Sequence, residues 1–190
     1  MATQNLANTA YRWGSSSYNS STDIKVGKTG STSSDGTKYR GYIRFPALDS
    51  TWVIKSIKLV VKRIDSYSAH TLSFGVSSSN AWGATRDWSK NYSISSGTNN
   101  KTLDITECKS IVQGYGSTWY VHILHGSGSN SYTEFDGTSG TPYLVVEYEF
   151  ATVYYHVGGA WQTCLVYYHN GAGWLQCIPY YNSGGTWVQV

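Results

Sequence analysis

Charged residues are scarce in this sequence and unevenly placed. They make up 13% of the 190 residues, and residues 151–190 contain none. The net charge of +3 is small, and the lysines are scattered rather than gathered in the cluster that a phosphate backbone requires. We therefore expect no nucleic acid among the partners of this chain.

Long apolar runs are missing as well. No segment approaches the ~18 consecutive apolar residues of a membrane-spanning helix, so we expect no membrane insertion. The first residues, MATQNLANTAYRWG, lack the basic and apolar regions of a signal peptide. The expectation is synthesis as a soluble chain in a cytoplasm.

The motifs of common catalytic classes are also absent. The sequence contains no GxSxG, no HExxH and no phosphate-binding loop. Glu134 with Asp136, and Glu147 with Glu149, stand two residues apart on expected strands and so share a face, where each pair could be close enough for a glycosidase acid and base. Solvent-facing carboxylates are the ordinary interpretation of such pairs. We expect no enzyme, and polysaccharide degradation remains as a further alternative.

Metal ligands show no spacing that favours a transition metal. His122 and His125 are three apart on an expected strand, so they point to opposite faces. We expect no cofactor. A structural calcium ion held by loop oxygens, with Asp23 or Asp35 as ligands, is the one alternative.

What the chain has in abundance is Gly, Ser, Thr, Asn and Tyr, a composition typical of short strands and polar turns. Alternating segments predict half-buried strands with these residues inward: Ile24, Val26, Ile43, Phe45, Ile57, Leu59, Val61, Leu72, Phe74, Val76, Leu144, Val146 and Tyr148. Two sheets facing one core explain the pattern. Residues 77–100 are expected to form a long irregular loop, and Thr106 to cap a short helix that ends at Gly114.

The last forty residues repeat themselves with a period of 13. Trp161, Trp174 and Trp187 fall in step, and so do the tyrosine pairs at 154–155, 167–168 and 180–181. Each unit has an aromatic run, a Gly-rich turn and a second run centred on Trp, which predicts a β-hairpin. A lone hairpin is marginal in water, so we expect residues 151–190 to dock or assemble.

The three cysteines, Cys108, Cys164 and Cys177, are too few for a disulfide framework. Cys164 and Cys177 occupy the same repeat position, where the third unit has Val190. They are interpreted as buried thiols that act as small apolar groups, or as a bridge between two repeats.

Several short segments occur in an order shared with a known family. They are DIKVG, RGYIRFP, IKSIKLVV, LDIT before a short helix, YTEF and TPYLVVEY, within residues 8–149. This order resembles DNRLRE domains, jelly-roll modules similar to carbohydrate-binding modules of bacterial surface proteins and polysaccharide-active enzymes. The resemblance implies a carbohydrate-binding jelly roll over residues 1–150 and adds no catalytic residue. One departure is Gln113-Gly114-Tyr115, where that family usually has a Trp.

The C-terminal units resemble the Y-x-x-G-G-x-W repeats that end small structural proteins of bacteriophages. This resemblance implies a virion component, whose partners are other virion proteins and a host-surface glycan. An uncharged aromatic tail also suits a homo-oligomer such as a trimer. The expected fold is therefore an all-β jelly-roll sandwich with one short helix, followed by three hairpin repeats.

Aromatic side chains are the candidate ligand-binding residues, because flat rings contact the apolar faces of sugars. The candidates are Trp82, Trp88, Trp161, Trp174, Trp187, Tyr155, Tyr168 and Tyr181. The alternative is that these rings pack within the core, between repeats or between subunits. Two functions follow: a virion protein that recognises host carbohydrate, or a decoration, head-fibre, tail or baseplate component without a glycan ligand.

Overall fold

The computed structural model describes most of residues 1–150 and the strands of the C-terminal repeats. The described ranges are 1–18, 20, 23–28, 38–65, 69–127, 132–137, 140–150, 153–157, 160–164, 167–169, 173–176, 180–183 and 186–189. Within the repeats it describes the pairing of strands and, at Tyr167, an exposed side chain. In these ranges no helix is long and apolar enough to cross a membrane.

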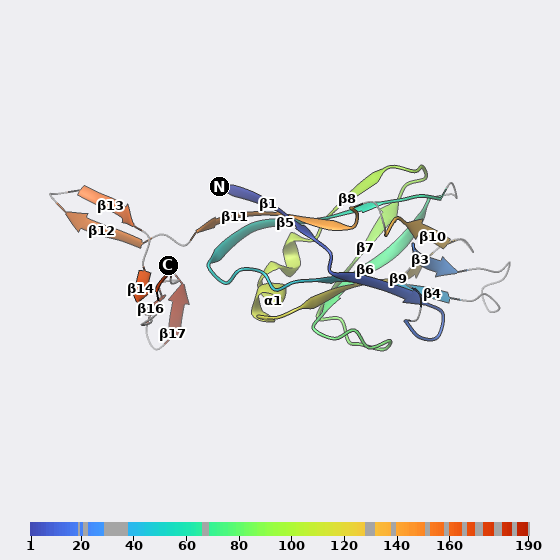
Figure 1. The fold of residues 1–190 in the computed structure, drawn as a ribbon, viewed down its shortest axis with the longest axis horizontal. Coiled ribbons are helices and arrows are strands. Elements are labelled where there is room, and N and C mark those ends of the chain that lie inside the picture. Colours follow the sequence, from blue (N-terminus) through green and yellow to red (C-terminus); the bar gives the residue numbers. More distant parts are fainter. Residues whose placement is uncertain are drawn as a thin grey trace.

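Two antiparallel sheets form the body of the protein (Figure 1). The four-stranded sheet has the order β1 (Ala2–Ala7), β11 (Tyr143–Phe150), β5 (Trp52–Lys62) and β8 (Asn100–Asp104). The seven-stranded sheet has the order β10 (Tyr132–Phe135), β3 (Ile24–Lys28), β4 (Lys38–Phe45), β9 (Trp119–Ser127), β6 (His70–Ser77) and β7 (Trp88–Ile94), and β2 (Ala10–Gly14) also pairs with β4.

The strand order is that of a jelly roll. Setting aside β2, β3 and β10 leaves the order β1-β11-β5-β8 in one sheet and β4-β9-β6-β7 in the other. Along the chain these strands change sheet one at a time, except that β6 and β7 are neighbours in the same sheet, which gives two interleaved Greek keys. The predicted all-β sandwich is confirmed.

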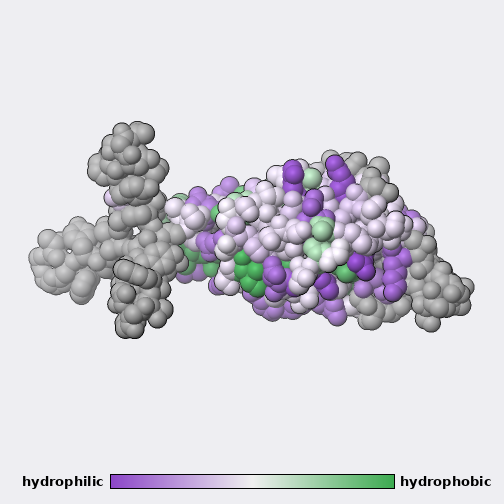
Figure 2. All heavy atoms as spheres, turned by 90° about the horizontal axis from the view of Figure 1, so that it is seen from below, coloured by the Kyte–Doolittle hydropathy of each residue, from purple (hydrophilic) through white to green (hydrophobic). Residues whose placement is uncertain are grey.

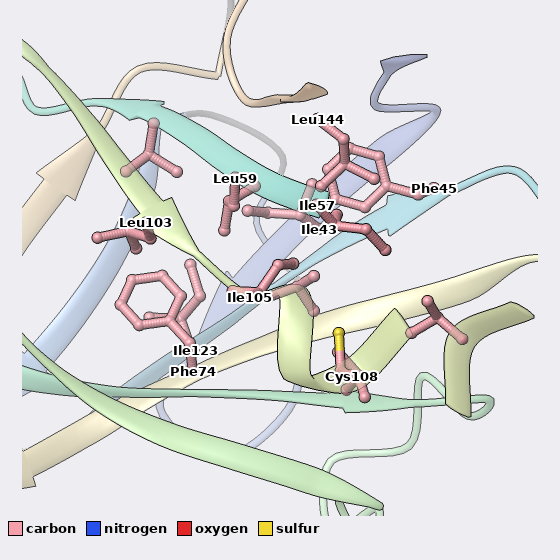
Figure 3. Close-up of a cluster of buried hydrophobic side chains, with 14 of the residues drawn as sticks. Ile43, Phe45, Ile57, Leu59, Phe74, Leu103, Ile105, Cys108, Ile123 and Leu144 are labelled. Carbon is pink, nitrogen blue, oxygen red and sulfur yellow. The ribbon is translucent and has the colours of Figure 1, made fainter. Parts of the chain in front are cut away.

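The core fills the space between the two sheets, as the alternation predicts. Ile43 and Phe45 of β4 face Ile57 and Leu59 of β5 across it (Figure 3), and all four side chains are fully buried. The other residues expected inward are also buried or pack against the core: Ile24, Val26, Val61, Leu72, Phe74, Val76, Leu144, Val146 and Tyr148. The outer surface differs, since hydrophilic and near-neutral residues cover most of the described face in Figure 2.

The predicted short helix exists but begins differently. A 3-10 turn, η1 (Thr106–Cys108), leads into α1 (Lys109–Gly114), and Val112 of α1 is buried in the core. The expected cap by Thr106 is wrong, since its hydroxyl lies 3.0 Å from the backbone nitrogen of Ile57 and ties the helix to β5. The carboxylate of Asp104 accepts the Thr106 N–H instead, at 2.9 Å.

The long loop expected at residues 77–100 is also wrong, because β7 lies within it. Trp88, Tyr92 and Ile94 turn toward the core, while Ser89, Asn91 and Ser93 are exposed. The strand forms the edge of its sheet, and Lys90 interrupts the apolar alternation, so its pattern resembles that of a polar loop. The irregular part shrinks to residues 78–87, which carry Trp82, and to the turn at residues 95–99.

A buried ion pair closes one end of the sandwich. The side chain of Arg63 has no exposed surface, and its Nη2 lies 2.6 Å from Oδ1 of Asp65. Arg63 also donates to the carbonyl of Ser95 at 2.7 Å, and Asp65 accepts the backbone N–H of Glu134 at 2.7 Å. The pair therefore links the end of β5 to β10 and to the turn between β7 and β8.

The C-terminal residues form the three predicted hairpins. They are β12 (Val153–Val157) with β13 (Ala160–Cys164), β14 (Tyr167–His169) with β15 (Trp174–Gln176), and β16 (Tyr180–Ser183) with β17 (Thr186–Gln189). The repeat is visible in the register, since each repeat tryptophan pairs with the residue after the tyrosine pair: His156 with Trp161, His169 with Trp174, and Asn182 with Trp187. This part of the fold prediction is confirmed.

Candidate functional site

The candidate site is a pocket on the outer face of the seven-stranded sheet, beside residues 78–87. We call it the outer-face pocket. It encloses about 320 Å³ and is lined by Tyr18, Arg40, Trp82, Gly83, Ala84, Thr85, Arg86, Ser89, His122 and Leu124. This volume lies at the lower end of the ~300–1,000 Å³ typical of small-molecule sites.

The strands supply the floor of the pocket through their outward positions. Ile43 and Ile123 fill the core, so their neighbours Tyr42 and His122 point to the opposite face, where they pair across β4 and β9. Gly75 of β6 pairs with His122 on the other side. A Cβ at Gly75 would lie 2.6 Å from Cδ of Arg86. The absence of a side chain at Gly75 therefore makes space for the Arg86 side chain to lie across β6.

His122 is buried and holds the covering loop to the sheet. The carbonyl oxygen of Ser79 only accepts hydrogen bonds, so the Nε2 that lies 2.9 Å away must carry the proton and donate. In the neutral ring Nδ1 then accepts from the hydroxyl of Tyr18, 3.1 Å away. Burial lowers the pKa of His122, and Arg86 adds to the effect. His122 is therefore neutral and acts as a fixed polar anchor.

Tyr18 joins the floor of the pocket to its wall. Its ring meets Tyr42 edge to face with 4.8 Å between centroids, and lies at the same distance from Trp82. Burial raises the pKa of Tyr18 to about 12, so the hydroxyl stays protonated at neutral pH. These contacts leave Tyr42 only 8% exposed although it points away from the core. The result is a rigid aromatic cluster.

Two arginines give the pocket its charge. The guanidinium of Arg40 lies over the Trp82 ring, 5.1 Å from its centroid, and one of its nitrogens is 3.5 Å from the Trp82 carbonyl oxygen. Arg86 donates to the hydroxyl of Ser73 at 2.8 Å. No carboxylate is among the described residues that line the pocket. The site is therefore aromatic, hydroxyl-bearing and positive.

A second pocket adjoins the first. It encloses about 150 Å³ between Lys38, Tyr39, Arg40, Leu124 and His125, and thus shares Arg40 and Leu124 with the outer-face pocket. We call it the adjacent pocket. Its lining is also basic and aromatic, and the two pockets adjoin at Arg40 and Leu124.

The sequence candidates divide among different places. Trp82 lines the outer-face pocket, whereas Trp88 packs against the core and its indole nitrogen lies 3.4 Å from Glu107. The two rings are therefore not brought together. The strands that carry the remaining candidates are described but their side chains are not: Trp161, Trp174, Trp187, Tyr155, Tyr168 and Tyr181. Cys177 lies outside the described residues, as does the side chain of Cys164, while Cys108 is a buried free thiol.

The carboxylates considered for catalysis or metal binding engage protein partners. Glu134 and Asp136 form ion pairs with Lys25 and Lys62, and Glu147 and Glu149 with Lys58 and Lys55. Asp23 accepts the backbone N–H of Gly137 at 3.2 Å, and Asp35 lies outside the described residues. In the described part of the chain no three His, Cys, Asp or Glu residues gather as metal ligands would.

Sequence reasoning missed Tyr18, Arg40, Arg86 and His122. A signal existed for Arg40, because it occupies an outward position on the strand whose inward residues, Ile43 and Phe45, were assigned. His122 lies on an expected strand, but no inward face was assigned to that strand. Tyr18 and Arg86 lie in irregular segments, and the sequence alone does not place them beside the sheet.

The chain was also compared with known proteins. No protein-family model matches it, and no curated protein matches it either. The function is therefore argued from the residues of this chain.

Proposed function

We propose that this chain is a non-enzymatic bacteriophage virion protein whose jelly-roll body binds a carbohydrate of the host surface in the outer-face pocket. The single observation that carries the proposal is the pocket at Trp82, where aromatic rings, hydroxyl groups and fixed polar side chains surround about 320 Å³. The phage context comes from the repeats at residues 151–190 and their resemblance to phage structural proteins.

A sugar suits this lining for a chemical reason. Sugar rings present apolar C–H faces and rims of hydroxyl groups, so their sites combine flat aromatic rings with short polar groups. Trp82 and Tyr18 supply the rings, while Thr85 and Ser89 supply hydroxyls at the rim. Tyr18 and His122 are already fixed by hydrogen bonds to each other and to the loop, so little side-chain entropy is lost on binding.

The test is binding of the intact chain to an array of host cell-envelope polysaccharides. Trp82→Ala is expected to abolish binding. Trp88→Ala is the matched control, because it removes the same ring from the other side of the sheet and outside the pocket. Retained binding by Trp82→Ala with loss in a Trp161→Ala variant would move the site to the repeats and overturn the proposal.

A structural role without a glycan is the second candidate, and the hairpins favour it. Each hairpin forms its own two-stranded sheet, so the described strands of the repeats have unpaired edges. Such edges are suited to pairing with another chain, as in a trimer or with other virion proteins. A defined oligomer in light scattering, together with no binding anywhere on the array, would favour this candidate.

A further inference from the structure

Among the described residues, no carboxylate lines the outer-face pocket beside its two arginines. Six ion pairs join described residues, and neither Arg40 nor Arg86 takes part in any of them. The carboxylate next in sequence, Asp87, is turned away and accepts a hydrogen bond from Tyr115 at 2.5 Å. Two arginines thus line one pocket in which the described part of the chain places no acid.

Both guanidinium groups are held in place from behind. Arg40 lies on the face of Trp82, and Arg86 is held by the hydroxyl of Ser73 across the gap that Gly75 leaves. A guanidinium has five N–H donors, and these contacts occupy only a part of them. The remaining donors suit the paired oxygens of a carboxylate or a phosphate, which arginine binds through two parallel hydrogen bonds.

The neighbouring titratable groups do not reduce this positive charge. His122 and Tyr18, which face the pocket from β9 and from the N-terminal segment, are hydrogen-bonded to each other. Burial lowers the pKa of His122 and raises the pKa of Tyr18 to about 12, so both are uncharged near neutral pH. The charge that a ligand meets in this pocket is therefore that of the two arginines.

The positive charge continues into the adjacent pocket. Arg40 lies between the two pockets, and Lys38 lines the second one. The spacing from Lys38 to Arg40 along β4 places both side chains on the same face of the strand. A polymer with an anionic group on successive units would meet a cation in each pocket.

We infer that the ligand is an acidic polysaccharide, whose anionic groups are bound by Arg40 and Arg86 and whose chain extends past Lys38. This inference rests on the proposed function, since it names the class of carbohydrate that the pocket takes. The anionic group is a carboxylate or a phosphate diester, which share the oxygen geometry that arginine recognises. Trp82 and Tyr18 contact the sugar ring that carries this group.

The experiment compares charged probes with a neutral ester of one of them. Binding of oligogalacturonate to the intact chain is measured by calorimetry beside binding of its methyl ester, and a glycerol-phosphate teichoic acid represents the phosphate class. We expect the acid or the teichoic acid to bind, and the ester to bind at least about tenfold more weakly. Arg40→Gln and Arg86→Gln should each weaken binding of the charged probe by about tenfold or more, and binding should fall as salt rises.

Arg44→Gln is the matched control, because it removes the same charge from the same strand outside both pockets, where Arg44 bonds to Thr9. Equal binding of the acid and the ester would overturn this inference and leave the proposed function standing. An equal loss in Arg44→Gln would also overturn it, since only net charge would then matter. If neither the acidic probes nor neutral saccharides bind, the proposed function fails together with the inference.

Discussion

Removal of the Arg63 guanidinium is expected to destabilise the sandwich severely. Its side chain is fully buried, and that of Asp65 is 3% exposed. Arg63→Met keeps the apolar stem but leaves the Asp65 carboxylate buried with the backbone N–H of Glu134 and without its cationic partner. Breaking a buried ion pair from one side costs ~3–5 kcal/mol. This is a large fraction of the ~5–15 kcal/mol by which domains are stable.

Urea unfolding of the intact chain, followed by circular dichroism, measures this effect. With a dependence of about 2 kcal/mol per molar urea, the loss corresponds to a midpoint lower by roughly 1.5–2.5 M. A matched variant, Asp65→Leu, removes the carboxylate that pairs with Arg63, and its urea midpoint should decrease by a similar amount. The native fold at zero urea is checked by the same signal before each titration.

The double variant decides whether the reasoning is correct. Arg63→Met with Asp65→Leu removes both charges of the pair, and neutral groups such as the carbonyl of Ser95 lose a partner, at ~1–3 kcal/mol each. The double variant should therefore lose less free energy of unfolding than the sum of the two single variants. The interpretation would be refuted if the urea midpoint of Arg63→Met decreased by less than ~0.5 M. Strict additivity of the two single variants in the double variant would refute it as well.

Three further outcomes are expected. Gly75→Ala should lower the free energy of unfolding by about 1–3 kcal/mol, measured by urea unfolding, because the added Cβ would lie 2.7 Å from the Trp88 carbonyl oxygen. The pKa of Tyr18 is raised by burial from 10.0 to about 12, so the stability it contributes is complete below pH 10.0 and is lost as the pH rises toward 12, which alkaline unfolding checks. Burial raises the pKa of the Cys108 thiol to about 12, so it should react with a disulfide reagent in mildly alkaline buffer only after unfolding.

Each of these outcomes has its own control. Gly114→Ala should be tolerated, since nothing lies within 4 Å of the added Cβ, and an equal loss there would remove the steric explanation. Tyr18→Phe should reduce the alkaline loss of stability, and an unchanged profile would contradict the assignment. The Cys108 test uses a chain with Cys164→Ser and Cys177→Ser, in which fast labelling of the folded state would show that the thiol is accessible.

Much of the fold follows from the sequence because the two-residue alternation of a β-strand determines which side chains are buried. Ile57 and Leu59 alternate with polar neighbours, so their strand and its inner face could be assigned without knowing the partner strand. The 13-residue repeat likewise defined the three hairpins. β7 was not predicted, because it is an edge strand with a polar outer face. An exposed lysine, Lys90, also occupies one of its inward positions and interrupts the apolar alternation.

The candidate site was less accessible to sequence reasoning. Trp82 was identified as a candidate from its place in an irregular segment, but the same argument applied to Trp88, which packs against the core. The difference is set by pairing, since Trp88 continues a strand opposite Val76 and Trp82 does not. Arg40 and His122 come together only through the register of β4 and β9, which depends on contacts between distant parts of the chain.

The position of β1 has a consequence for synthesis. In the described sheet β1 pairs with β11 alone, Ala2 opposite Tyr148, and β11 lies between β1 and β5. At ~5–20 residues per second, a ribosome needs roughly 7–28 s to make the residues that separate these partners. During that time β1 and the edge of β5 lack the strand that later joins them, so the four-stranded sheet closes only after residue 150 has been made. Three of the six residues of β1, ATQNLA, are polar, which lowers its tendency to aggregate before β11 is made.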